Sequence, residues 1–302
     1  MEKQVAVVIL AAGQGSRMRS NLPKPLIPIL GTPMVQHILN SLPLDVQVHI
    51  IISPHHEETF RSAIGDQSYL HQTTPNGTAG ALTSNLEKLL EYDACIVLNG
   101  DTPFAPKCLI NSLLSSNQNN ILVAFETHKE NSYGQIQMEG SAATAIIEAA
   151  DRKEIISHLC YSGVMKISRE YLKKLSHIQP SSTPSEYYIT KIVSPQTPFT
   201  VIQEEETCLH GINSYDELSR CEEEIKQYMQ RRLLQKGVTF DNFSSTLIHP
   251  CVSIDSGCHI SSHVSITGKT HIGSNTQVNQ GAIIDSTHIG ESCQILPYSI
   301  IK

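Results

Sequence analysis

A six-residue repeat in the C-terminal part of the chain restricts the possible folds more than any other feature. Aliphatic residues recur every six positions from Ile248 to Ile284, and after a slip of one residue at Ile289 the spacing resumes at Ile295 and Ile301. The positions two before these residues are mostly small or β-branched. One inward aliphatic residue per six-residue turn is typical of a parallel β-helix, in which each coil buries its residues against the next. We expect residues 248–302 to form a short left-handed parallel β-helix of hexapeptide repeats, with coils of about 18 residues.

The preceding part of the chain alternates between predicted strands and predicted helices. Apolar runs at 5–10, 46–52 and 95–101 read as buried strands, and 33–40, 57–64 and 77–91 read as helices. This alternation predicts an α/β domain over residues 1–225, with a Rossmann-like, mostly parallel sheet and helices on both faces. Residues 214–236 show helical amphipathicity ended by Gly237, so residues 226–247 are expected to be a helical linker.

Composition narrows the possible partners. The 302 residues carry a net charge of −7, which argues against a nucleic-acid partner because such a partner requires a basic surface. The eight cysteines include no C-x-x-C pair, a pattern that favours reduced thiols over disulfides or a zinc site. No apolar run is long enough to span a membrane, and Glu2-Lys3 before the first strand does not form a signal peptide. We therefore expect a cytoplasmic protein without a membrane partner.

The turn after the first predicted strand carries groups suited to a polyanion. Gly13 and Gly15 lack side chains, so backbone N–H groups can approach phosphates closely. Arg17 and Lys24 follow, and Pro23 and Pro25 are expected to hold Lys24 in an extended segment. Alone, Gly13-Gln-Gly15 could be an ordinary strand-to-helix turn, because Met18 replaces the third glycine of a dinucleotide site and no Gly-Lys-Ser/Thr follows. Glycines and cations together indicate a nucleoside triphosphate site.

The complete string from Leu10 to Leu26 resembles the signature of the sugar-1-phosphate nucleotidylyltransferases, L-A-A-G-x-G-[ST]-R-[ML]…P-K-[PV]-L. Further motifs follow in the family's order: Gly100-Asp101-Thr-Pro103, Tyr133-Gly134, Ile146-Ile-Glu148, Tyr161-Ser-Gly163-Val164, Glu186-Tyr-Tyr-Ile-Thr190 and His210-Gly-Ile-Asn213. In sequence they look like the uridylyltransferase part of the bacterial bifunctional N-acetylglucosamine-1-phosphate uridylyltransferase/glucosamine-1-phosphate acetyltransferases.

This resemblance implies substrates, a cofactor and site residues. The substrates would be UTP and N-acetylglucosamine 1-phosphate, and the product UDP-N-acetylglucosamine, a precursor of peptidoglycan and lipopolysaccharide. Mg²⁺ would be bound by Asp101 and Asn213, and Arg17 and Lys24 would be catalytic at the triphosphate. The implied nucleotide-binding residues are Leu10, Ala11, Ala12, Gly13, Lys24, Gln72, Gly77, Thr78, Asn99, Gly100 and Asp101. The implied sugar-phosphate-binding residues are Gly134, Glu148, Tyr161, Tyr188, Thr190 and Asn213. A homotrimer through the β-helix is also implied.

Four positions depart from the family pattern and keep alternatives open. Tyr161 stands for Asn, Ala150 for Lys, Lys191 for Asp and Asn99 for Tyr. Another hexose 1-phosphate or another nucleotide is therefore an alternative substrate. A non-catalytic scaffold is a further alternative, although a decayed site would be expected to lose its charged ligands.

Acetyltransferase activity is not expected, because the repeat stops before the motifs that the family uses for it. The histidines of the repeat, at 249, 259, 263, 271 and 288, are interpreted as polar edges of the coils.

Overall fold

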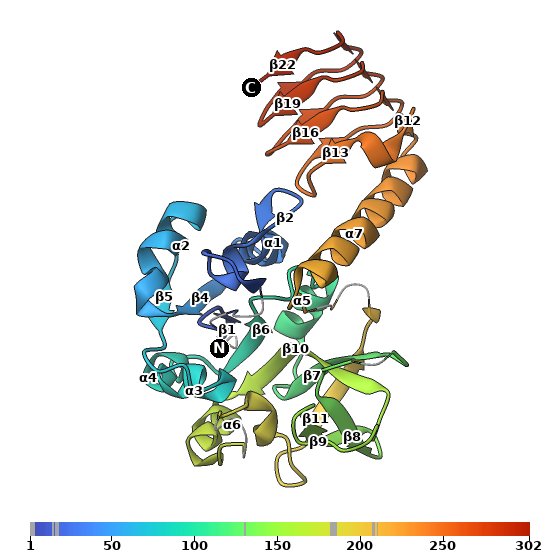
Figure 1. The fold of residues 1–302 in the computed structure, drawn as a ribbon. Helices are drawn as coiled ribbons and strands as arrows, with labels where there is room; N and C mark the ends of the chain where they lie inside the picture. The colour runs from blue at the N-terminus through green and yellow to red at the C-terminus, as the bar shows by residue number, and fades with distance from the viewer. Residues whose placement is uncertain are drawn as a thin grey trace. The chain divides into compact units, whose positions relative to one another are not determined.

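The computed structural model describes residues 4–13, 15, 18–129, 131–181, 186–206, 209 and 211–302 (Figure 1). By their contacts the residues form two compact units. The first comprises Met1–Ile27 and Pro33–Tyr215, and the second comprises Pro28–Thr32 and Asp216–Lys302. Within the described residues, no helix combines the length and the apolar character needed to cross a membrane.

The first unit is built on a nine-stranded sheet with the order β5-β4-β1-β6-β10-β7-β11-β9-β8. The strands are β1 (Val5–Leu10), β4 (Gln47–Ile52), β5 (Tyr69–His71), β6 (Ala94–Asn99), β7 (Ile121–Glu126), β8 (Gln135–Glu139), β9 (Ala142–Ile147), β10 (Leu159–Ser168) and β11 (Phe199–Gln203). The pairings make β9 and β10 antiparallel to the other seven strands, which share one direction. The prediction of a mostly parallel α/β sheet is therefore confirmed.

Helices cover both faces of this sheet, as predicted. One apolar core includes side chains from α3 (Thr78–Thr83), α4 (Leu86–Leu89) and α6 (Arg169–Lys174). The other includes side chains from α1 (Met34–Ser41), α2 (Glu57–Ile64) and α5 (Lys107–Ser115). Alternate residues of β1 enter the two cores, Ala6 and Val8 on one side and Val7 and Ile9 on the other. Burial on both faces explains why this strand is a continuous apolar run.

The single helix expected over 77–91 is wrong, because the segment forms two helices, α3 and α4. The break lies at Asn85, whose Nδ2 donates to the carbonyl oxygens of Ala81 (2.9 Å) and His71 (3.0 Å). An Asn side chain that binds backbone carbonyls competes with regular helical hydrogen bonding.

The extended conformation expected at Lys24 is also wrong. Lys24–Leu26 forms a 3₁₀ turn, closed by hydrogen bonds from Leu26 N to Pro23 O (2.8 Å) and from Ile27 N to Lys24 O (3.1 Å). These turn bonds outweigh the preference for extended backbone before Pro25.

The second unit contains the long helix α7 (Tyr215–Gln235), in agreement with the helix predicted over 214–236. Gly237, at φ +82°, follows its end. Eleven short strands come next: β12 (Thr239–Phe240), β13 (Leu247–Ile248), β14 (Ser253–Ile254), β15 (His259–Ile260), β16 (Ser265–Thr267), β17 (His271–Ile272), β18 (Gln277–Val278), β19 (Ile283–Asp285), β20 (His288–Ile289), β21 (Gln294–Ile295) and β22 (Ile300–Ile301).

These strands form three parallel sheets, one for each side of a β-helix, with the orders β12-β15-β18-β21, β13-β16-β19-β22 and β14-β17-β20. Figure 1 shows the stack of β13, β16, β19 and β22. Paired residues lie 20 positions apart between β12 and β15, 18 apart in the coils that follow, as in Ser253 with His271, and 17 apart in the last, as in His271 with His288. The one-residue slip in the sequence is thus a shortened coil.

The interior of the β-helix confirms the repeat. The aliphatic residues at the six-residue spacing are buried from Ile248 to Ile295, and Ile301 is partly buried. Cys258, Val264, Thr270, Thr276 and Ala282, two positions earlier in their repeats, are buried as well. The inward threonines are satisfied by backbone carbonyls, as Thr276 Oγ1 donates to Gly290 O at 2.9 Å. This pairing lets a polar residue occupy an interior position.

A short segment from early in the chain completes the second unit. Residues Pro28–Thr32 include β2 (Pro28–Ile29) and the first residue of β3 (Thr32–Pro33). Leu30 N donates to Glu222 Oε1 on α7 at 2.8 Å. Gly31 has φ +75°, and a Cβ there would lie 2.4 Å from the imidazole of His249. Only glycine fits this close approach.

Candidate active site

A cavity of about 450 Å³ in the first unit gathers most of the predicted site residues. It lies where β1 and β6 end, at Leu10 and Asn99, and ligands of open α/β sheets bind outside the carboxyl ends of such strands. All eleven residues predicted to bind the nucleotide line it, together with Tyr188 and Asn213 from the predicted sugar-phosphate set. The cavity lining also includes Gly15, Pro25, Pro75, Ala81 and Glu186.

The glycines of the first turn shape one wall of this cavity. A Cβ at Gly13 would have no other heavy atom within 4 Å, so the backbone there faces open space. Gly15 has φ +56°, and a Cβ at Gly15 would lie 2.6 Å from Cβ of Lys24. The missing side chain at Gly15 therefore makes room for the stem of Lys24. Arg17, predicted to be catalytic, and His210 lie outside the residues that the structure describes.

Lys24, Asp101 and Asn213 meet at the cavity, although 77 and 189 residues separate Lys24 from its two partners. The ammonium group of Lys24 donates to Asp101 Oδ2 and, at 2.9 Å, to Asn213 Oδ1. Ile212 N donates to Asp101 O at 3.0 Å, which ties the segment of Asn213 to that of Asp101. A carboxylate oxygen and an amide oxygen thus converge on one cation.

Two such oxygens fit Mg²⁺, which is commonly held by one or two carboxylates, substrate phosphates and water. Among the residues that the structure describes, no group of three or more His, Cys, Asp or Glu side chains could hold a metal ion. The pair formed by Asp101 and Asn213 therefore suits an ion that takes its remaining ligands from a bound phosphate chain.

Gln72 is buried beside the turn that opens α3. Its Nε2 donates to Asn76 Oδ1 (2.9 Å) and to Gly77 O (3.0 Å). Gly77 has φ +98°, and a Cβ there would lie 2.6 Å from Tyr187 O. Thr78 Oγ1 accepts from Ile189 N at 2.9 Å, so the loops around 77 and 188 hold each other. Tyr187 N donates to Asn76 O at 2.8 Å and joins the same two loops. Sequence reasoning did not assign a role to either residue: Asn76 belongs to no motif, and Tyr187 lies within the motif Glu186–Thr190 but was not singled out.

The other predicted sugar-phosphate residues form a cluster beside this cavity. Thr190 Oγ1 donates to Glu148 Oε1, and a Cβ at Gly134 would lie 2.7 Å from Ile146 Cγ2 and 3.4 Å from Glu148 Oε2. Tyr161 N donates to Gly134 O at 2.8 Å. Burial raises the pKa of Glu148, opposed by its hydrogen bond from Thr190. None of these four residues is among those that line the 450 Å³ cavity.

Within this cluster, the hydroxyl group of Tyr161 stands out because it is buried without a hydrogen-bond partner, whereas the hydroxyl of Thr190 bonds to Glu148. The side chain is 8% exposed, and no hydrogen-bond partner reaches the buried Oη within the described part of the chain. Burial raises the pKa of Tyr161, and the nearby carboxylate of Glu148 adds to this effect. A buried polar atom without a partner is rare in folded proteins and calls for an explanation.

Two of the four departures from the family pattern have visible partners. Lys191 Nζ pairs with Asp151 Oδ2 at 2.7 Å, directly after Ala150, so the positive charge at 191 is balanced locally. Asn99 lies against Gly163, where a Cβ would be 2.5 Å from Asn99 Nδ2. Gly163 has φ +84° within an irregular part of β10, so this position requires glycine.

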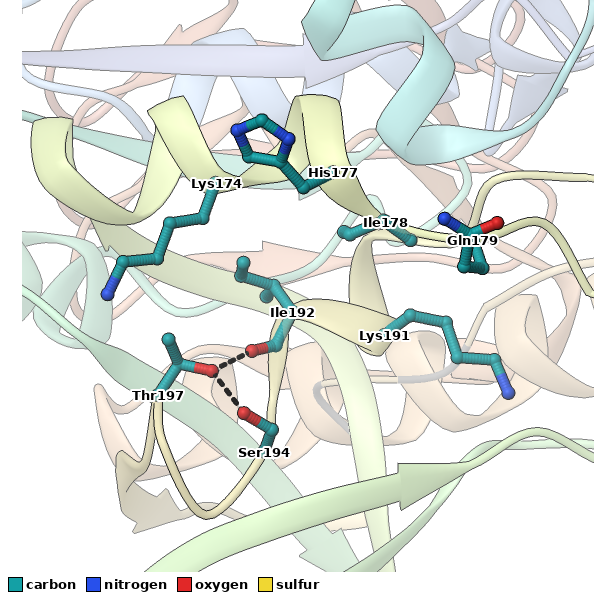
Figure 2. Close-up of a pocket in the computed structure, with 8 residues that line it drawn as sticks. All are labelled: Lys174, His177, Ile178, Gln179, Lys191, Ile192, Ser194 and Thr197. Atoms are coloured by element: carbon teal, nitrogen blue, oxygen red, sulfur yellow. Dashed lines mark hydrogen bonds between the residues drawn. The ribbon is translucent and has the colours of Figure 1, made fainter.

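A second cavity in the first unit, of about 410 Å³, does not bring reactive or charged side chains together (Figure 2). Lys174, His177 and Lys191 line it, but their side chains point in different directions around Ile178 and Ile192. Lys174 pairs with Glu170 at 3.1 Å and Lys191 pairs with Asp151. Thr197 Oγ1 bonds to Ser194 Oγ and donates to Ile192 O, which closes the local turn. The two lysines and His177 therefore do not converge on a common ligand.

Comparisons with known proteins agree with these features. Residues 7–234 match the MobA-like NTP transferase domain. The chain is 31% identical to the bifunctional protein GlmU of Thermodesulfovibrio yellowstonii, covering 98% of this chain and 69% of that protein. It is 27% identical to GlmU of Desulfotalea psychrophila, covering 99% and 94%. A crystal structure from Bacillus anthracis, assigned as a glucose-1-phosphate thymidylyltransferase in complex with sucrose, shares the fold. It aligns with a TM-score of 0.60 and 20% identity over 72% of this chain and 94% of that one.

Proposed function

The chain belongs to the MobA-like NTP transferase family as a sugar-1-phosphate nucleotidyltransferase related to GlmU, and on that premise we propose its reaction. The reaction is the Mg²⁺-dependent transfer of a uridylyl group from UTP to N-acetylglucosamine 1-phosphate, which gives UDP-N-acetylglucosamine and pyrophosphate. The observation that carries this proposal is the convergence of Lys24, Asp101 and Asn213 at a cavity lined by every residue predicted to bind the nucleotide. UDP-N-acetylglucosamine would serve as a cell-wall precursor.

The chemistry requires charge control more than proton transfer. An oxygen of the sugar phosphate attacks the α-phosphorus of UTP, a new P–O bond forms, and the bond to the pyrophosphate oxygen breaks. A phosphomonoester has a second pKa of about 6, so its oxygen is already anionic and no general base is needed. Backbone amides at Ala12 and Gly13, with Lys24 and Arg17, would neutralise the triphosphate. Mg²⁺, held by Asp101 and Asn213, would supply further positive charge at the phosphates when bound.

The side chain of Gln72 offers a hydrogen-bond acceptor to the proposed base. Its Nε2 is already bonded to Asn76 and Gly77, which leaves the side-chain oxygen to accept a hydrogen bond. Uracil and thymine both present such a donor at N3, although the amino groups of the other bases are donors as well, so this contact is compatible with UTP without selecting it. UTP is the proposed substrate, and a thymidine nucleotide is the alternative that this contact also permits.

For the sugar 1-phosphate that accepts the uridylyl group, a second candidate has specific support. Gly134, Glu148, Tyr188 and Thr190 are the proposed sugar-phosphate residues. Tyr161, larger than the Asn of the family pattern and with a buried hydroxyl, favours another hexose 1-phosphate as a second candidate. Replacement Tyr161→Asn should lower the KM for N-acetylglucosamine 1-phosphate if this ring restricts the acceptor. An unchanged KM would separate Tyr161 from sugar recognition.

Pyrophosphate release with Mg²⁺ tests the reaction directly. UTP with N-acetylglucosamine 1-phosphate should give the highest kcat/KM in a panel that also contains glucose 1-phosphate and the other nucleoside triphosphates. A different preferred pair would keep the mechanism and change the substrate. If the folded protein released no pyrophosphate with any substrate pair, the non-catalytic scaffold would be the favoured alternative.

Replacing Asp101 tests the metal assignment. Asp101→Ala should abolish the Mg²⁺-dependent turnover and leave the circular dichroism spectrum unchanged. Asp66→Ala is the matched control, because Asp66 is 89% exposed and does not line the cavity. Turnover by Asp101→Ala at the rate of the unaltered protein would contradict the assignment.

Three further properties belong to the same proposal. A cytoplasmic location is supported by the cysteines at 95, 108, 160, 221, 251, 258 and 293, which form no disulfide. Acetyltransferase activity is not part of the proposed function. A homotrimer is proposed through the β-helix, and the apolar outward side chains of Leu247, Ile283 and Ile300 on one of its sheets support this assembly.

A further inference from the structure

The ammonium group of Lys24 lies between the two residues proposed to hold the metal ion. It donates to Asp101 Oδ2 and to Asn213 Oδ1, the two oxygens that converge there. The side chains of Lys24 and Asp101 are 12% and 23% exposed, so this ion pair is largely shielded from solvent. Of the described residues that line the cavity, Lys24 alone carries a positive charge. The protein's own cation therefore competes for the ligands of an external one.

The stem of Lys24 is fixed, whereas its charged end can move. Cβ of Lys24 packs against the backbone of Gly15, and Pro23 and Pro25 flank the residue at the start of the 3₁₀ turn. Beyond Cβ, a lysine side chain keeps several rotatable bonds that carry a compact charge. Because Lys24 lines the same cavity as Gly13 and Gly77, its ammonium group can leave Asp101 for an anion bound there without moving the backbone.

We propose that Lys24 acts as a built-in competitor of the metal ion. In the nucleotide-free protein its ammonium group holds Asp101 and Asn213, and it transfers to the triphosphate when nucleotide and metal arrive together. An ammonium group and a divalent cation a few ångströms apart repel each other, so binding both to one carboxylate is electrostatically unfavourable. A free metal ion then binds weakly, and a metal–triphosphate complex binds well because it offers Lys24 a new partner. This inference rests on the proposed metal role of Asp101 and Asn213.

Binding of Mn²⁺ to the nucleotide-free protein, followed by electron paramagnetic resonance, tests the competition without any turnover. Lys24→Met keeps the stem and removes the charge, and it should bind Mn²⁺ about 10-fold tighter than the unaltered protein. Lys24→Arg keeps the charge and should stay close to the unaltered protein. Equal or weaker Mn²⁺ binding by Lys24→Met would overturn the proposal. Lys24→Gln provides the same comparison if Lys24→Met does not fold, as judged by thermal melting.

A second replacement locates the bound ion. Asp101→Asn, combined with Lys24→Met, should remove the gain in Mn²⁺ affinity, and a gain that survives would place the ion elsewhere and overturn the proposal. The outcome is separable from the proposed reaction. Tighter Mn²⁺ binding by Lys24→Met, with no pyrophosphate released from any substrate pair, would reject the transferase and keep the competition. Turnover with an unchanged Mn²⁺ affinity would reject the competition alone.

Discussion

The hydroxyl of Tyr161 is buried among apolar side chains and has no partner within the described residues. A buried polar group left without a hydrogen bond costs about 1–3 kcal/mol. Tyr161→Phe removes only this hydroxyl, so it should raise the free energy of unfolding by about 1 kcal/mol in urea titrations. Tyr92→Phe is the matched control and should lower it, because Tyr92 Oη bonds to His49 Nε2 at 2.9 Å. A loss of stability in Tyr161→Phe would show that Oη has a partner.

At the same scale, the motifs of the sequence predicted which residues line the 450 Å³ cavity, but they did not predict the ion pair that forms next to Ala150. Most of these residues lie at the ends of β1 and β6 or at the start of α3, Gln72 directly follows β5, and Lys24 begins the turn Lys24–Leu26. Local structure therefore brings most of them to one edge of the sheet. The ion pair between Lys191 and Asp151 joins residues 40 positions apart. It depends on how the chain after β9 packs against the turn at Ile189–Ile192, and no local pattern encodes that packing.

At the scale of elements, β4 carries a buried histidine that makes its stability depend on pH. His49 Nδ1 bonds to Ser68 Oγ at 2.7 Å and Nε2 bonds to Tyr92 Oη. Burial lowers the pKa of His49 below 6.5, with Lys88 acting in the same direction and Glu91 in the opposite one. Below pH 6.5 the unfolded chain therefore binds more protons at this residue than the folded chain, and the free energy of unfolding falls.

Urea midpoints measured at pH 7.5 and 5.5 check this dependence. The unaltered protein should lose more stability between these two values than His49→Gln, because only the unaltered protein must keep a neutral imidazole in the sheet. Comparing the loss of stability in the two proteins cancels the contributions of the other histidines, which both proteins share. An equal loss in both proteins would mean that His49 titrates alike in the folded and unfolded chains.

Elements were predictable where burial follows a local period. The β-helix strands repeat one buried residue in six, and β1 is apolar because both of its faces are covered. The break between α3 and α4 was not predicted. It depends on the hydrogen bond from Asn85 to His71 O, a residue on β5, and such tertiary contacts override helical propensity.

At the scale of the whole molecule, one side of the β-helix differs from the other two. The sheet β13-β16-β19-β22 places Leu247, Ser265, Ile283 and Ile300 in one outward row, and Ile283 is 41% exposed. The outward rows of the other sheets consist of Thr239, His259, Gln277 and Gln294, and of Ser253, His271 and His288. An apolar row on one side only is suited to contact with other copies of the chain.

Ile283→Glu should therefore convert the proposed trimer into a monomer, because the interface would have to bury an unpaired charge. Light scattering after size-exclusion chromatography measures the mass. Gln277→Glu, an exposed position on a polar side of the β-helix, is the matched control and should remain trimeric. A monomeric unaltered protein, or a trimeric Ile283→Glu, would contradict this assembly.

The clustering of Pro28–Thr32 with the second unit has a consequence for how the chain is made. Leu30 leaves the ribosome long before Glu222, since 192 residues separate these two hydrogen-bonded partners. During synthesis, the segment Pro28–Thr32 is made together with the first unit, between Ile27 and Pro33. The second unit can therefore be completed only after Asp216–Lys302 has been synthesised. A gene divided after residue 215 would encode a β-helix fragment without the segment Pro28–Thr32, in which Leu30 bonds to Glu222 and Gly31 lies against His249. Each of the two units packs as a separate body, yet each consists of two chain segments, so neither is encoded by one continuous stretch of the gene.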